Sequence, residues 1–176
     1  MKEKIKNFIL IVLIIIFCIS LSPITMQNDT YYTIAIGEHI LENGIDMKDP
    51  FSWHENLPYT YPHWGYDVAT YLVYNIGNII SGEIGGYIAI YVSTIILASM
   101  LGILLYRTNK RIVKNTIISF AITLLAIYSV RDYIAARAQL VTFILFIFEI
   151  YCIEMFLEKN KKRYVLGLIL IPTVIA

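Results

Sequence analysis

"YIAIYVSTIILASMLGILLY", residues 87–106, is an uncharged run of twenty mostly apolar residues in the middle of the chain. An α-helix needs about 20 apolar residues to cross the hydrocarbon core of a membrane. The whole chain is 58% hydrophobic and has a mean hydropathy of +0.67, whereas a soluble domain is usually about 45–50% apolar. The run therefore predicts an all-α membrane protein in which this segment spans the bilayer.

Other apolar runs lie on both sides of this segment. They predict further membrane-spanning helices at about 8–25, 112–130 and 138–157, and the start of a fifth at 164–176. The last run is too short to span. We therefore expect a polytopic protein with four transmembrane helices plus a truncated fifth. We also expect the chain to be a fragment or truncated product, whose missing helices come from a continuation or from another chain.

The basic residues alternate along the chain in a way that predicts its orientation. Eleven of the fourteen lie before the first run, between the second and third, or between the fourth and fifth. Positive charge marks the cytoplasmic ends of membrane helices, so we expect a multi-pass cell-membrane protein with a cytoplasmic N-terminus. Residues 26–86 then form an extracytoplasmic loop. The basic flanks are short and do not indicate a nucleic-acid partner.

The long loop is expected to contain two helices that lie at the membrane surface. Asn28 and Asp29 are good N-cap residues, and Gly44 is a good C-cap, for a helix over about 30–43. A second helix is expected over about 66–80, too short and too polar to cross the membrane. The sequence "SGEIGG" then turns the chain into the span at 87–106.

Between these helices lies the strip "DPFSWHENLPYTYPHWGYD", residues 49–67, which holds both tryptophans of the chain. Its aromatic rings are suited to the membrane interface. His54 and His63, with Asp49 or Glu55, could ligate a metal, but no H-E-x-x-H signature is present. The alternative is that both histidines are interfacial or hydrogen-bonded.

A few ionisable residues could carry chemistry. Asp29 could act as a general base or a metal ligand, or simply cap a helix. Arg131 and Arg137 face outward against the charge trend and could bind a phosphate. Their alternative is pairing with Asp132 or with the acidic first loop. Glu149 lies about midway along a predicted span, which suggests a function or a buried partner.

Several short motifs together resemble the GT-C class of polytopic membrane glycosyltransferases, in a bacterial branch with a recurring first outer loop. The matching segments are Asp29, "GEHILENG" (37–44), "DPFSWH" (49–54), "HWGYDV" (63–68) and "RAQLVTFIL" (137–145). Two positions depart from that pattern. Ala138 replaces a proline, and Thr30 stands where many members carry a second acidic residue.

The resemblance implies a sugar transferase whose active site faces outward and whose donor is a polyprenyl-phosphate sugar. It implies that Asp29 is the catalytic base or coordinates a divalent metal such as Mg²⁺ or Mn²⁺, and that Arg131 or Arg137 holds the lipid phosphate. The strip would form a wall and lid over the substrate. Its candidate substrate-binding residues are Asp49, Trp53, His54, His63 and Trp64.

Two other functions remain open from the sequence. One is a non-catalytic membrane protein whose outer loop binds a partner or a lipid headgroup. The other is a transporter component, which Glu149 suggests. We expect the 176 residues alone to be inactive, because the resembling enzymes need further spans to close the donor cavity.

Overall fold

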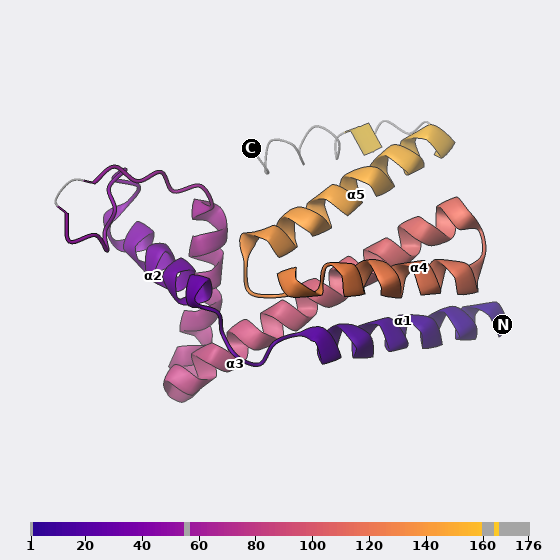
Figure 1. The fold of residues 1–176 in the computed structure, drawn as a ribbon, viewed down its shortest axis with the longest axis horizontal. Helices are drawn as coiled ribbons and strands as arrows, with labels where there is room; N and C mark the ends of the chain where they lie inside the picture. The colour runs from indigo at the N-terminus through magenta and orange to yellow at the C-terminus, as the bar shows by residue number, and fades with distance from the viewer. Residues whose placement is uncertain (1, 55–56, 160–163, 166–176) are drawn as a thin grey trace. The chain divides into compact units, whose positions relative to one another are not determined.

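The computed structural model describes residues 2–54, 57–159 and 164–165, and the regular secondary structure among them is helical, with no strand. The expected all-α class is therefore confirmed. The helices and one 3₁₀ turn follow in the order α1 (Lys2–Leu21), α2 (Asn28–Asn43), α3 (Trp64–Val113), α4 (Thr116–Ser129), η1 (Arg131–Tyr133) and α5 (Ala138–Lys159) (Figure 1).

Three helices, α1, α3 and α5, are long and apolar enough to cross a membrane. They indicate a membrane-associated protein. The run expected to span at 112–130 forms only the 14-residue helix α4, roughly 21 Å long at 1.5 Å per residue. It begins late because Asn115 caps it, accepting hydrogen bonds from the backbone of Ile117 and Ile118. Apart from residues 164–165, the expected partial span at 164–176 lies outside the described residues.

Several element boundaries differ from the sequence expectation. The first helix ends at Leu21 instead of 25, because Pro23 cannot continue it. Gln27, not Asn28 or Asp29, occupies the N-cap position of α2, so Asp29 lies in the first helical turn. In that position its carboxylate faces the positive end of the helix dipole.

The helices expected at 66–80 and 87–106 are both part of α3. The element is interrupted only at Ser81 and Gly82, where Gly82 has φ 67° and ψ −162°. This conformation is open essentially to glycine alone. The turn is thus much shorter than the expected "SGEIGG" segment, and the helix continues to Val113.

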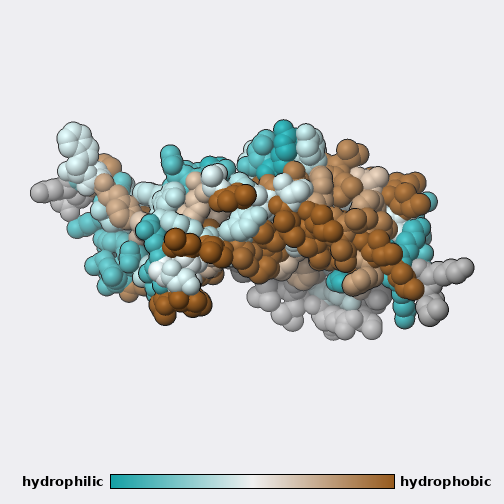
Figure 2. Space-filling view, turned by 90° about the horizontal axis from the view of Figure 1, so that it is seen from below, coloured by the Kyte–Doolittle hydropathy of each residue, from teal (hydrophilic) through white to brown (hydrophobic). Residues whose placement is uncertain are grey.

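The chain divides into two compact units. Unit 1 contains the described residues of 1–22, 94–135 and 139–176. Its core includes Ile14 and Cys18 of α1, Ala98 and Tyr106 of α3, and Ile127 of α4. Apolar side chains dominate the exposed face of α1 in Figure 2, including Ile5, Phe8, Ile9, Ile16 and Ile19. Such a surface suits contact with lipid chains.

Unit 2 contains residues 23–93 and 136–138. Helix α2 crosses the first part of α3 at Gly37, where an added Cβ would lie 2.2 Å from the backbone oxygen of Asp67. Only a residue without a side chain permits this approach. The segment after α2 folds back as a short hairpin, with backbone hydrogen bonds from Asp49 to Leu57 and from Tyr59 to Met47.

Candidate functional site

The segment before α5 returns to the start of α2 within unit 2. A guanidinium nitrogen of Arg137 lies 2.7 Å from a carboxylate oxygen of Asp29. One residue along α2, the hydroxyl of Thr30 donates to the backbone oxygen of Ala136 at 3.3 Å. Two residues chosen from the sequence as base and phosphate ligand are thus adjacent, although 108 positions separate them. The alternative expected for Arg137, pairing with the acidic first loop, is what the structure shows.

The two partners of this ion pair differ in exposure. The side chain of Asp29 is 66% exposed, whereas that of Arg137 is 30% exposed. Within the described residues, the Nε of Arg137 is buried and has no hydrogen-bond partner, and the same is true of the side-chain oxygen of Gln27. Buried polar atoms are usually satisfied. Arg137 therefore has a hydrogen-bond donor left over after its contact with Asp29.

The described residues around Asp29 offer a divalent metal no cluster of ligating side chains. In the part of the chain that the structure describes, no three His, Cys, Asp or Glu side chains come together to hold one. The carboxylate of Asp29 faces a guanidinium, which would compete with a cation for the same oxygens. Mg²⁺ and Mn²⁺ prefer several oxygen ligands. A single carboxylate beside an arginine would leave most of these ligands to water or to a substrate phosphate.

An aromatic cluster lies one helical turn beyond Asp29. The Tyr32 ring contacts Phe51 at 5.4 Å and Tyr59 at 6.3 Å between centroids, both in edge-on geometry. Tyr59 in turn contacts Tyr61 at 5.0 Å. Sequence reasoning placed Phe51, Tyr59 and Tyr61 in the aromatic wall of the strip but did not choose Tyr32. The three-residue spacing of Asp29 and Tyr32, which places them on one helix face, could have found Tyr32.

A polar contact fixes the strip to α2. The hydroxyl of Tyr61 lies 2.7 Å from Asp46 Oδ1 and 2.8 Å from the backbone oxygen of Lys48. The hydrogen bond from Tyr61 holds the pKa of Asp46 below its usual range. His39 of α2 lies 3.4 Å from the Asp46 carboxylate, and its ring stacks on Tyr61. His39 and Asp46 therefore anchor the strip.

The strip residues expected to bind substrate take different positions. The carboxylate of Asp49 accepts a hydrogen bond from the backbone of Phe51 and so stabilises the hairpin turn. Trp53 is 91% exposed and contacts the His54 ring at 4.9 Å. His63 and Trp64 are exposed near the start of α3. Within the described residues, none of these side chains forms an ion pair or hydrogen bond with Asp29 or Arg137.

A second carboxyl group, which the sequence analysis did not choose, is buried in unit 2. Asp67 is 7% exposed, and burial raises its pKa to about 6, opposed by the charge of His63 and a hydrogen bond from Thr33. Thr33 lies one turn after Asp29 on α2. The quoted motif "HWGYDV" contains Asp67, but only its burial against α2 distinguishes it from the exposed acids of the loop.

Two other expected residues belong to unit 1. The Nε of Arg131 lies 3.7 Å from Asp132, and its guanidinium lies over the Tyr128 ring at 4.4 Å. Its expected alternative, pairing with Asp132, is therefore observed. Glu149 lies half-buried on α5, and among the described residues it forms no ion pair.

No family model, curated protein or solved structure matches this chain.

Proposed function

We propose that this chain is part of a membrane sugar transferase that uses a polyprenyl-phosphate sugar at the extracytoplasmic face, as its GT-C-like motifs imply. The observation that carries the proposal is the 2.7 Å contact between Asp29 and Arg137. In the proposed topology the N-terminus is cytoplasmic. Helices α1, α5 and the second part of α3 span the membrane. The shorter α4, followed by η1, returns the chain to the outer side, where α2 and the first part of α3 lie at the surface.

The ion pair gives the proposed reaction a resting state. A donor phosphate would compete for Arg137, because guanidinium groups bind phosphate in a bidentate way. The side chain of Arg137 is 30% exposed, which gives a phosphate access to it. Once the phosphate binds Arg137, the carboxylate of Asp29 is no longer paired with the guanidinium and becomes available as a general base.

The transfer step then needs two contributions from these residues. The acceptor oxygen attacks the anomeric carbon of the sugar while Asp29 takes the acceptor's proton. The bond between that carbon and the phosphate oxygen breaks, and its electron pair leaves with the lipid phosphate. Arg137 offsets the charge that develops there. Tyr32, Phe51 and Tyr59 offer flat apolar faces to the sugar ring.

The test separates donor binding from transfer. Membranes from cells that carry the protein would be assayed with a panel of undecaprenyl-phosphate sugars labelled in the sugar. Donor binding would be measured on the 176-residue chain in nanodiscs. We expect Arg137→Gln to lose donor binding. Asp29→Asn should keep it but lower transfer by about 10²–10⁴-fold, the contribution of a general base.

Asp132→Asn is the matched control, since it removes an aspartate that also lies beside an arginine but in unit 1. It should change neither measurement. Full transfer by Asp29→Asn would remove Asp29 from the mechanism. Equal binding of sugar-linked and sugar-free undecaprenyl phosphate by every variant would contradict the proposal as a whole.

A second function, non-catalytic binding of a lipid headgroup by the outer loop, is favoured by one observation. Trp53 extends from the strip with 91% exposure, as expected of a ring that inserts at a membrane interface. Under that function, Trp53→Ala would weaken the binding of the outer loop to vesicles. Asp29→Asn would change neither vesicle binding nor donor binding. A transporter role would instead make Glu149→Gln more damaging than Asp29→Asn.

A further inference from the structure

Two cavities meet at one residue in unit 1. The first, about 420 Å³, is lined by apolar side chains of α3 and α5 together with Arg107. The second, also about 420 Å³, is lined by Arg107, Lys110, Arg111 and Tyr151. Arg107 thus stands at the junction of an apolar groove and a basic pocket. The function proposed above uses neither.

The groove follows one face of each helix. On α3 its lining residues are Met100, Ile103, Leu104 and Arg107, a spacing of three or four that places them in one row. The row continues into the basic pocket with Lys110 and Arg111. On α5 the groove residues Ile144, Leu145 and Phe148 are followed by Tyr151. Both rows therefore change from apolar to polar at the same end.

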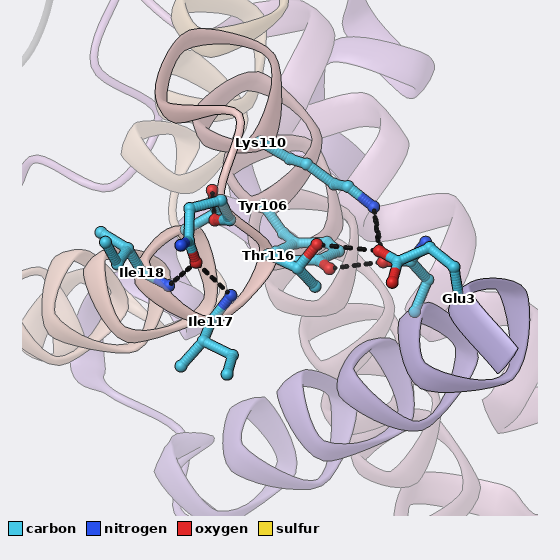
Figure 3. Close-up of polar contacts among 9 residues, drawn as sticks. Glu3, Tyr106, Lys110, Thr116, Ile117 and Ile118 are labelled. Carbon is cyan, nitrogen blue, oxygen red and sulfur yellow. Dashed lines mark hydrogen bonds and ion pairs between the residues drawn. The ribbon is translucent and has the colours of Figure 1, made fainter.

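The charges in the basic pocket are only partly balanced. Figure 3 shows Lys110 pointing toward Glu3, and its amine also donates to Asn7 at 2.6 Å. Arg111 pairs with Glu158 and lies over the Tyr151 ring at 5.6 Å. Its Nε is buried and has no partner within the described residues. Arg107 is exposed and, among those residues, forms no ion pair.

The polar cluster in Figure 3 fixes this end of unit 1. Glu3 of α1 accepts hydrogen bonds from Lys110 of α3 and from the Thr116 hydroxyl at the start of α4. Tyr106 donates to Asn7 of α1 at 3.0 Å. The helix ends are thus held together without using Arg107. Its guanidinium remains available to an external anion.

We infer that unit 1 binds an anionic phospholipid, with its phosphate at Arg107 and Arg111 and one acyl chain in the groove between α3 and α5. The apolar lining of the groove suits a hydrocarbon chain, and guanidinium groups suit a phosphate. A second protein helix would fill the groove but would also need an anion placed at Arg107. A phospholipid supplies both the hydrocarbon chain and the phosphate in one molecule, and phospholipids surround helices that cross a membrane.

The test uses the full chain purified in detergent and exposed to vesicles of dioleoylphosphatidylglycerol and dioleoylphosphatidylcholine in equal amounts. Native mass spectrometry counts the lipids retained. We expect about tenfold more phosphatidylglycerol than phosphatidylcholine on the wild-type chain. Arg107→Gln should lower that preference about tenfold, as expected for loss of a charged hydrogen bond, while Arg107→Lys should keep part of it.

Two matched pairs separate charge from shape. Lys114→Gln removes a positive charge at the same end but lines neither cavity, so it should leave the preference unchanged. Met100→Trp fills the groove from its exposed side, and Ile96→Trp places the same ring elsewhere on α3. Only Met100→Trp should lower phosphatidylglycerol retention, by about tenfold. The thermal unfolding of Met100→Trp and Ile96→Trp is checked in parallel.

Each remaining outcome would overturn the inference. Equal retention of the two lipids by the wild-type chain would remove the phosphate contact. Displacement of phosphatidylglycerol by millimolar inorganic phosphate would assign the basic pocket to a free anion. Unchanged retention in both Arg107→Gln and Met100→Trp would place the lipid elsewhere. Dimers that disappear in Met100→Trp would assign the groove to a second copy of the chain.

Discussion

Helices approach each other closely at a glycine in both units, but the neighbouring atoms differ. In unit 1 a Cβ at Gly102 would lie 2.7 Å from a methyl of Ile14 and 3.1 Å from Cys18 Sγ. In unit 2 a Cβ at Gly37 would lie 2.2 Å from the backbone oxygen of Asp67. The buried Ile14 and Cys18 side chains can shift slightly at some cost in packing, whereas a helix backbone cannot move without moving its whole element. At these two positions unit 1 is therefore more adjustable than unit 2, which carries the candidate site.

The largest expected effect tests this difference directly. Gly37→Ala should destabilise unit 2 by about 3 kcal/mol or more, because the helices α2 and α3 must separate. Gly102→Ala should cost about 1 kcal/mol, since Ile14 and Cys18 can shift. Thermal unfolding in detergent measures both, and limited proteolysis of residues 44–63 reports whether unit 2 opens. Equal losses of stability in the two variants would contradict the contrast.

A second test concerns the carboxyl group that the same crossing buries. Burial raises the pKa of Asp67 to about 6, so the folded state favours its neutral form. Stability should therefore fall as the pH rises from about 4 to about 6 and then level off. Near pH 4 the carboxyl is largely neutral in the folded state. At pH 7 its ionisation costs up to about 3 kcal/mol.

Asp67→Asn should remove this pH dependence. The variant is expected to be more stable than the wild type at pH 7 and to lose that advantage near pH 4. Melting temperatures across that range measure the effect, with Asp132→Asn, an exposed position in unit 1, as the control that follows the wild-type profile. A wild-type melting temperature that rises steadily from pH 4 to 7, with Asp67→Asn parallel to it, would count against a buried Asp67.

The same two units show how far sequence reasoning reached. Apolar length and helix-capping patterns predicted the all-α class and placed helices near α2, α3 and α5, because those signals are local. The junction at Ser81 and Gly82 was expected to be a longer turn. In the structure the two helix parts approach so closely that a Cβ added at Gly77 would lie 2.2 Å from the backbone oxygen of Gly85. Nothing in the local sequence states that contact.

The candidate site divides along similar lines. Asp29 and Arg137 could be chosen from their types and positions, and their contact followed only from the fold. Tyr32 and Asp67 were missed, and the contacts of Tyr32 with Phe51 and Tyr59 were not predicted, because they depend on long-range packing. Tyr32 contacts residues 19 and 27 positions away. Asp67 resembles the other loop acids until α2 covers it. Arg131 looked equivalent to Arg137 in the sequence, yet the structure assigns them to different units.

The smallest expected effect compares an ion pair from each unit. The pair of Arg137 with Asp29 and the pair of Arg111 with Glu158 each join a guanidinium to a largely exposed carboxylate. Exposed pairs contribute about 0–1 kcal/mol and are screened by salt. Double-mutant cycles with Arg137→Gln and Asp29→Asn, and with Arg111→Gln and Glu158→Gln, should each give a coupling energy of about 0.5 kcal/mol.

The coupling energies of the two ion pairs should differ only when a phosphate ligand is present. Undecaprenyl-phosphate sugar should reduce the coupling of Arg137 with Asp29, because the phosphate takes the guanidinium from the carboxylate. It should leave the coupling of Arg111 with Glu158 unchanged, provided that phosphatidylglycerol is absent. Repeating both cycles in about 0.5 M salt screens the exposed contribution. If the donor still lowers the coupling energy of Arg137 with Asp29 in high salt, the phosphate replaces the carboxylate at Arg137 directly. If salt alone lowers that coupling energy by the same amount, the donor acts only by changing the electrostatic field around the pair.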